Sequence, residues 1–208
     1  MRVRPVVGSS VLSVALALLA LLAGGASAAD LYSSPPVGPA AYVPPSQPVS
    51  FVSEIRIGAS AQDPWSPEKG SANVTGEILF AKPFTTADLF TSYFVPRPHI
   101  GGSLNFRGDT SFAYVGLTWT VDITPRFFVE ASFGGAVHNG NTESNPAFIP
   151  PDRSALGCSP TFRESGSIGY RFSQNWSIMA TIEHLSNAGI CAQNRGLTNV
   201  GARLGYTF

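Results

Sequence analysis

Apolar and polar residues alternate along most of the chain, from residue 49 to the last residue. The clearest run is WSIMATIEHLS, at residues 176–186, where every second residue from Trp176 to Ile182 is apolar. Alternation with a period of two is typical of a β-strand with one face toward an apolar environment. Eight such segments follow one another, at residues 51–59, 74–80, 100–106, 114–121, 127–137, 162–172, 176–186 and 198–208.

The polar faces of these segments carry charges of both signs, separated by small residues. This composition suits the interior of a narrow closed barrel, where each charge can be paired. The apolar faces would then contact lipid, with aromatic residues at the membrane borders. The sequence therefore predicts an all-β fold, an eight-stranded antiparallel transmembrane β-barrel over residues 50–208. The charged residues on the polar faces are Glu54, Glu77, Glu130, Glu183, Arg56, Arg163, Arg171 and Arg203.

The N-terminal residues differ from this pattern and have the features of a secretory signal. Two arginines among the first four residues precede an apolar run at residues 11–22 and an Ala-Ser-Ala triplet that ends at Ala28, as at a signal-peptidase site. The apolar run is shorter than the roughly 20 residues that a spanning helix needs. We therefore predict a signal peptide at residues 1–28. Residues 29–49 contain six prolines and favour an extended, Pro-rich periplasmic tail.

Composition and the C-terminus indicate the location and the partners. The chain has 13 basic and 13 acidic side chains, a balance that gives no reason to expect a nucleic-acid partner. Its last five residues, Leu204 to Phe208, end on an aromatic residue, which is similar to the signature that the outer-membrane assembly machinery recognises. Together with the signal peptide, this predicts a multi-pass protein of the cell outer membrane. With both termini in the periplasm, odd-numbered strands run outward.

The segment IEHLSNAGI, at residues 182–190, adds two polar residues to the apolar face of the seventh strand. His184 and Ser186 share that face near its outer end, about 6.5 Å apart along the strand. A neutral imidazole is a base near neutral pH, and a serine hydroxyl needs such a base to become a nucleophile. Asn187 and Gly189 would offer a side-chain amide and an unhindered backbone N–H as oxyanion donors. This chemistry is acyl transfer to serine followed by hydrolysis.

The same two residues also have a simpler interpretation, in which polar side chains mark the point where the strand leaves the hydrocarbon. The motif alone does not decide between the two. The preceding turn gives a further geometric prediction: if it centres on Gln174, Glu164 pairs across from His184, and Phe162 from Ser186.

The run EHLSNAGICAQNRGLTN, at residues 183–199, resembles the signature of the outer-membrane lipid A 3-O-deacylases, also grouped as acyloxyacyl hydrolase-like proteins. The segment GCSPTFRESGSIGYRF, at residues 157–172, resembles the same family. The resemblance implies an eight-stranded barrel with a serine-hydrolase site on its outer face. Its substrate would be lipid A in lipopolysaccharide, from which it removes the ester-linked acyl chain at the 3-position. The implied roles are His184 as base, Ser186 as nucleophile, Asn187 with Gly189 as oxyanion donors, and Phe162 as a substrate-binding aromatic residue.

Thr198 departs from the family pattern, in which a glutamate stands at this place and orients the histidine. A threonine cannot supply the negative charge that stabilises an imidazolium. Two explanations remain open: Glu164 replaces the glutamate as a catalytic residue, or the histidine and serine work more slowly without an acid. The departure also leaves an alternative function, a non-catalytic structural or surface-interaction barrel.

The two cysteines fall in neighbouring outer loops, Cys158 before the sixth strand and Cys191 after the seventh. In an oxidising compartment such a pair favours a disulfide, which would join the loops around the site. His99 and His138 are isolated, and the chain has neither a Cys/His ligand cluster nor a phosphate-binding glycine loop. We therefore expect no metal and no cofactor.

Overall fold

The computed structural model describes residues 50–84, 86 and 88–208. The signal peptide predicted at residues 1–28 and the Pro-rich tail predicted at residues 29–49 lie outside the described residues. Among the described helices, none has the length and the apolar character needed to cross a membrane.

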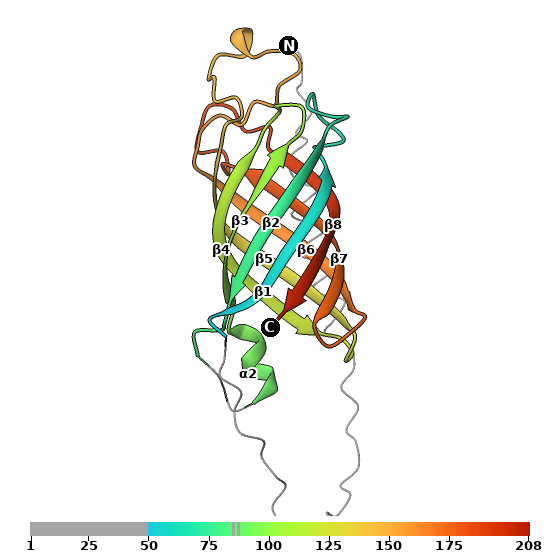
Figure 1. Cartoon of the computed structure of the whole chain (residues 1–208). Helices are drawn as coiled ribbons and strands as arrows, with labels where there is room; N and C mark the ends of the chain where they lie inside the picture. Colours follow the sequence, from blue (N-terminus) through green and yellow to red (C-terminus); the bar gives the residue numbers. More distant parts are fainter. Residues whose placement is uncertain (1–49, 85, 87) are drawn as a thin grey trace, which may run out of the picture. The chain divides into compact units, whose positions relative to one another are not determined.

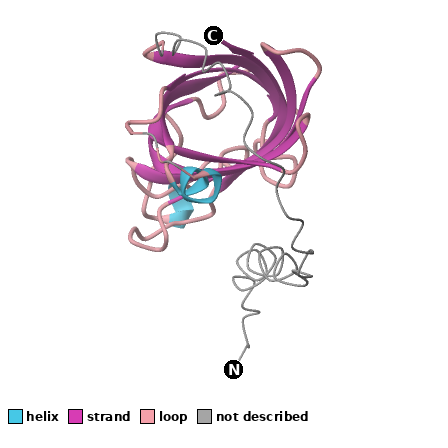
Figure 2. Cartoon of the chain, turned by 90° about the horizontal axis from the view of Figure 1, so that it is seen from below, coloured by secondary structure: helices cyan, strands magenta, loops and turns pink. Residues whose placement is uncertain are grey.

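Eight antiparallel strands form a closed barrel, in which each strand pairs with its neighbours in sequence and β1 pairs with β8 (Figure 1, Figure 2). The predicted fold class is confirmed, since each strand overlaps one of the alternating segments. Two short helices lie in the connections, α2 (Leu89–Phe94) and the 3₁₀ helix η1 (Pro146–Phe148). The strands are β1 (Val52–Ala61), β2 (Ala72–Phe80), β3 (Arg97–Asn105), β4 (Phe112–Asp122), β5 (Phe127–His138), β6 (Thr161–Arg171), β7 (Trp176–Ser186) and β8 (Leu197–Thr207).

The two ends of the barrel differ in their connections. The end at which β1 begins and β8 ends also carries α2 and two short turns, and it lies at the bottom of Figure 1. Outer-membrane barrels have short periplasmic turns and longer extracellular loops. The opposite end is therefore the outer end, and its loops are residues 62–71, 106–111, 139–160 and 187–196.

Charged side chains fill the barrel interior in paired form. The Arg56 guanidinium is only 4% exposed and lies 2.8, 3.1 and 2.8 Å from the carboxylates of Glu54, Glu77 and Glu130. Arg97 adds contacts of 2.7 and 2.9 Å to Glu54 and Glu130. Taking a charge out of water is tolerated when it is paired and hydrogen-bonded, and these contacts meet that requirement.

A second interior group centres on Glu183 of β7. Its carboxylate accepts hydrogen bonds from Arg163 at 2.8 Å and from Arg203 at 2.9 Å. All three side chains are at least 95% buried. Glu183 therefore ties β7 to β6 and β8 from the inside of the barrel.

Arg171 was predicted to be one of the paired charges of the barrel interior, and it is paired, but near the periplasmic end. It is the last residue of β6, so its side chain reaches the mouth of the barrel and pairs with Asp122 at 2.8 Å. Arg97, which the sequence pattern did not select, occupies the more central position because its side chain reaches inward from the start of β3.

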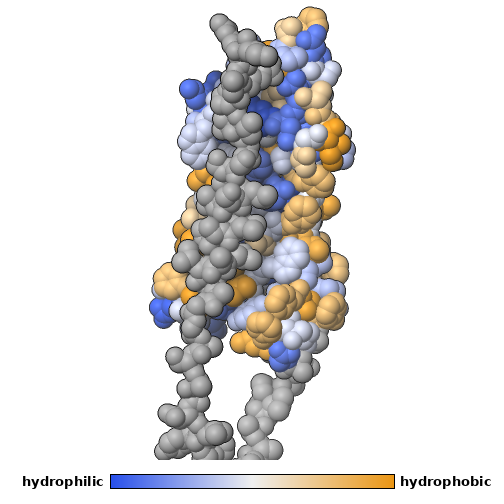
Figure 3. Space-filling model, turned by 180° about the vertical axis from the view of Figure 1, so that it is seen from behind, coloured by the Kyte–Doolittle hydropathy of each residue, from blue (hydrophilic) through white to orange (hydrophobic). Residues whose placement is uncertain are grey.

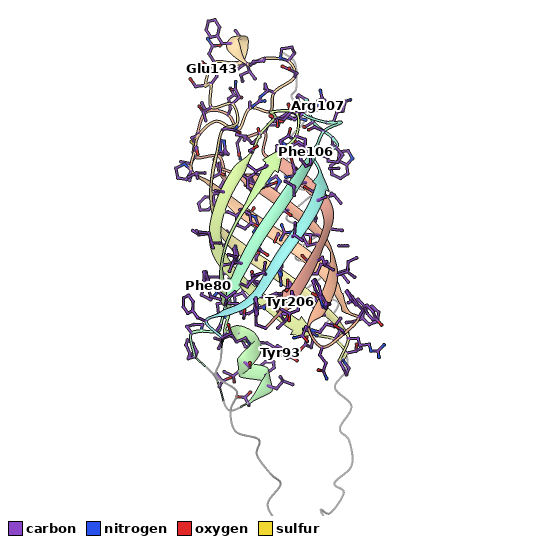
Figure 4. All side chains as sticks on the ribbon, in the orientation of Figure 1. Phe80, Tyr93, Phe106, Arg107, Glu143 and Tyr206 are labelled. Carbon is purple, nitrogen blue, oxygen red and sulfur yellow. A yellow bond between two sulfur atoms is a disulfide. The ribbon has the colours of Figure 1, made fainter. Side chains whose placement is uncertain are left out.

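The outward faces of the strands are apolar, and Figure 3 shows such side chains along the wall. Ile57, Val115 and Ile168 are 57–67% exposed at this surface. Aromatic pairs gather at the periplasmic end, where Figure 4 labels Phe80 and Tyr206. The pairs are Phe51 with Phe80, Phe127 with Tyr170, and Trp176 with Tyr206. Such a band of aromatic residues is typical of the membrane border of a β-barrel.

We predict that Glu183→Gln lowers the free energy of unfolding by about 3–5 kcal/mol, because two buried arginines lose the nearer of their two shared counter-charges and keep only Glu77, at 3.5 and 4.0 Å. A urea titration of the barrel folded in detergent micelles measures this change. Glu143→Gln is the matched control, since Glu143 is exposed in an outer loop (Figure 4) and should leave the midpoint nearly unchanged. Equal midpoints for both variants would contradict a stabilising role of the interior group.

Candidate active site

The outer end of β7 carries the two residues on which the predicted chemistry depends. His184 and Ser186 are half-buried on the outward face of the strand. Glu183 and Leu185, which alternate with them, are buried in the interior at 3% and 0% exposure. The pleat of the strand thus directs the imidazole and the hydroxyl toward the membrane side, next to the long loops.

The pairing of β6 with β7 confirms the predicted register. Glu164 lies across from His184, and Phe162 lies across from Ser186. The ring of Phe162 stacks on that of Phe133 in β5, with ring centres 5.9 Å apart and planes 22° apart. The four predicted side chains therefore form one patch on the outer wall, extended by a further aromatic residue.

The His184 ring is held by the threonine that departs from the family pattern. Thr198 faces His184 across the pairing of β7 with β8, and its Oγ1 lies 2.7 Å from Nδ1 of the ring. In the tautomer with hydrogen on Nδ1, this nitrogen donates to Oγ1 and leaves the lone pair of Nε2 free. Thr198 can thus orient the imidazole, although it carries no charge.

Gly196 borders the other edge of the same ring. Its φ is +73°, in the left-handed region that favours glycine. A Cβ on this residue would lie 2.7 Å from Cε1 and 3.1 Å from Nε2 of His184. The glycine therefore provides the space that the imidazole occupies.

Two contacts that the chemistry needs are not formed among the described residues. No hydrogen bond joins the Ser186 hydroxyl to His184, and none joins Glu164 to His184, whose Nδ1 bonds to Thr198 instead. Catalytic hydrogen bonds are often open in a protein without substrate and tighten in its complex. Ser186 and His184 share the face of β7 that this contact requires.

The side chain of Asn187 is used for structure. It is 2% exposed, and its Nδ2 donates to the carbonyls of Leu156 at 2.7 Å and Gln193 at 2.6 Å. Its Oδ1 accepts the backbone N–H of Gly189 at 2.9 Å. The predicted oxyanion donors are therefore both engaged within the loop: the amide of Asn187 donates to two backbone carbonyls, and the Gly189 N–H donates to Oδ1 of Asn187.

The outer loops beside the site are joined to one another. Cys158 and Cys191, whose pairing the sequence favours, form a disulfide with a Cα–Cα distance of 6.1 Å. The backbone N–H of Arg195 donates to the carbonyl of Ala155 at 2.9 Å. The loop of residues 139–160, whose order the sequence does not predict, is thus fastened to the loop that follows Ser186.

Within the described ranges, no three His, Cys, Asp or Glu side chains come together as a metal site would require. The described side chains thus include no candidate set of metal ligands.

The protein-family model for lipid A 3-O-deacylase (PagL) matches residues 36–207 of the chain. The chain belongs to this family. The predicted resemblance and enzyme class are confirmed: the protein is an outer-membrane β-barrel of the lipid A 3-O-deacylase family. The family match does not itself identify the catalytic residues.

Several solved structures are similar to this deacylase-family protein, and the first of them shares its fold. The crystal structure of the outer membrane enzyme PagL is 14% identical, with a TM-score of 0.56 over 74% of this chain and 99% of that one. A de novo designed transmembrane β-barrel is 13% identical (TM-score 0.49, 76% and 96% covered). The Yersinia pestis outer membrane protein Ail is 14% identical (TM-score 0.44, 76% and 100% covered). Among curated proteins the chain has no match.

Two residues beside the candidate site were not selected from the sequence. Phe133 was assigned only to an apolar face, and its contact with Phe162 follows from the pairing of β5 with β6. Gly196 was noted as part of the resemblance, but its place against the imidazole depends on the path of a loop. The register of β5 could have indicated the first, whereas no pattern in the sequence indicates the second.

We predict that Gly196→Ala lowers deacylase activity at least tenfold, because the new Cβ displaces the imidazole in addition to straining the backbone. The measurement is the rate of fatty-acid release from lipid A by the purified barrel. Gly108→Ala is the matched control, since Gly108 also has a positive φ (+80°) but nothing within 4 Å of the Cβ position. A similar loss in both variants would point to backbone strain alone.

Proposed function

We propose that Ser186 is the nucleophile and His184 the general base in the removal of the 3-position acyl chain from lipid A. The observation that carries this proposal is the shared outward face of the two residues at the outer end of β7, in a chain of the lipid A 3-O-deacylase family. The apolar wall next to them and the polar loops above them match the two halves of a glycolipid.

The reaction begins when Nε2 of His184 takes the proton of the Ser186 hydroxyl, while Nδ1–H donates to Thr198. The serine oxygen attacks the ester carbonyl and forms a tetrahedral oxyanion. Collapse breaks the bond to the sugar oxygen, which receives the proton from the imidazolium. Water, activated by the same imidazole, then cleaves the acyl–serine ester. The products are the free fatty acid and lipid A with a 3-hydroxyl group.

Phe162 is the proposed contact for the acyl chain. Its ring is 37% exposed, stacks on Phe133 and lies across from Ser186 in the sheet. An acyl chain that lies along these rings follows the apolar wall, so its ester carbonyl reaches the serine at the membrane border. Burying apolar chain surface against the rings is favourable even beside lipid when the contact is close-packed.

For the oxyanion we propose the backbone N–H of Gly189, in exchange for its present bond to Asn187. Nothing lies within 4 Å of the Cβ position of Gly189, so a carbonyl oxygen can approach its backbone. Asn187 then contributes by shaping the loop, since both of its amide hydrogens are held by carbonyls of Leu156 and Gln193.

The acid that assists His184 is a separate question. Glu164 has the position expected from the sequence, directly across from His184 in the β6–β7 pairing, and is half-buried beside it. Glu164 is thus the replacement acid that the sequence suggests, but the ring nitrogen that it would have to bond, Nδ1, is held by Thr198.

We further propose that the outer-membrane assembly machinery recognises the C-terminal strand. Phe208 is 59% exposed and contacts Tyr206 edge to face, with ring centres 5.2 Å apart. This aromatic end lies outside the closed interior and is open to a partner during insertion.

We predict that Ser186→Ala lowers deacylation roughly 10³-fold or more, because the acyl–serine ester can no longer form. Mass spectrometry of lipid A from cells that express each variant measures the loss of one hydroxyacyl chain. Ser177→Ala, on the inward face of the same strand, should retain full activity. Equal deacylation by native protein and folded Ser186→Ala would reject the proposed nucleophile.

A further inference from the structure

We propose that Asp63, in the loop after β1, supplies the negative charge that stabilises the His184 imidazolium, with Thr198 as the connecting residue. The inference rests on the proposed function, since it concerns a positioning residue for the same reaction. Asp63 would thus serve as the acid that other family members have at the position of Thr198. It lies in the loop after β1, whereas Thr198 lies in β8.

The end of β1 brings the three residues to one edge of the barrel wall. β1 pairs with β8 as far as its last residue, Ala61, which lies across from Val200. Two residues beyond the strand, the backbone N–H of Asp63 bonds to the side chain of Asn199, the neighbour of Thr198. On its other side, Thr198 pairs with His184.

Hydrogen bonds hold Asp63 in this place. Its backbone N–H donates to Oδ1 of Asn199 at 3.1 Å, and the hydroxyl of Ser154 lies 3.5 Å from its Oδ2. The residue is only 6% exposed. Its φ of +32° lies in the left-handed region, which aspartate tolerates better than most residues. The carboxylate is thus fixed in position, as a group that acts on a neighbouring ring should be.

Thr198 lies between the two groups. Its hydroxyl bonds to Nδ1 of His184 at 2.7 Å, and the side chain of the next residue, Asn199, accepts the backbone N–H of Asp63 at 3.1 Å. The proposed connection is therefore a through-space charge effect, without direct contact between Asp63 and the ring.

The surroundings of Asp63 contain charges of both signs. Burial raises the pKa of its carboxyl above the ordinary value, and Glu68 in the same loop acts in the same direction. Hydrogen bonds from Ser66 and Thr198 and the charge of Arg195 act in the opposite direction. Glu164 on β6 is the other acid beside His184, and it lies on the opposite side of the imidazole from Thr198.

A purely structural role for Asp63 predicts a different result from a charge effect. A carboxylate that favours the imidazolium holds the proton on the ring, so its removal lets the imidazole lose that proton at lower pH. Loss of a loop contact lowers activity without moving that ionisation. The pH profile of kcat/KM therefore separates the two roles.

We expect Asp63→Asn to lower the plateau of kcat/KM at least tenfold and to shift its acidic limb to lower pH. The loss should be smaller than the roughly 10⁴-fold effect of neutralising a directly bonded aspartate in a serine protease. Asp63→Glu keeps the charge and should keep the acidic limb where it is in the native protein. The assay is fatty-acid release from purified lipid A in detergent micelles, with folding verified by heat-modifiable gel mobility.

Glu143→Gln, at an exposed acid of an outer loop, is the control variant, and its acidic limb should remain unshifted. An unshifted limb in folded Asp63→Asn would overturn the proposal, and a shift in Glu164→Gln alone would assign the charge to Glu164 instead. If Asp63→Asn does not fold, Asp63→Glu provides the test. Its acidic limb should match that of the native protein, and a shifted limb would overturn the proposal. Failure of the proposed function would give a different result from failure of the Asp63 proposal. In that case folded Ser186→Ala would release fatty acid as fast as the native protein.

Discussion

The ion pairs inside the barrel fix the register of β7, and this register decides on which side of the wall His184 and Ser186 lie. Side chains alternate along a strand, so a slip of one residue would turn both of them into the interior. The same slip would carry Glu183 away from Arg163 and Arg203 and toward lipid, where an unpaired charge costs several kcal/mol. Charges that take no part in the proposed chemistry therefore keep His184 and Ser186 on the outward face.

The position of the site along the strand is as important as its face. Toward the periplasm, the same face continues with Ile182 and Ile178, which are about half exposed to the hydrocarbon. Toward the outside, the loop after Ser186 is closed by the Asn187 amide and by the disulfide to Cys158. The serine thus lies where an apolar wall meets a rigid polar rim, which suits an ester between an acyl chain and a sugar.

Much of this arrangement could be predicted because it follows from periodicity. Period-two alternation gives the strands, their inward and outward faces and, with a short turn, the pairing of Glu164 with His184. Loop paths have no such periodicity. The contact of Gly196 with the imidazole, the inward amide of Asn187 and the approach of Asp63 to Thr198 depend on loop conformations that the sequence pattern does not encode. The interior position of Arg97 was missed because it begins its strand, where the pattern is weakest.

The most direct test of the account is covalent labelling of the nucleophile in the folded barrel. A long-chain alkyl fluorophosphonate is added to outer membranes that contain the protein, and the modified peptide is mapped by mass spectrometry. The account predicts one label, on Ser186, and its loss in the His184→Ala variant, because the hydroxyl needs the imidazole as base. A label on another serine, or equal labelling of Ser186 without His184, would contradict a histidine-activated serine on the lipid-facing wall.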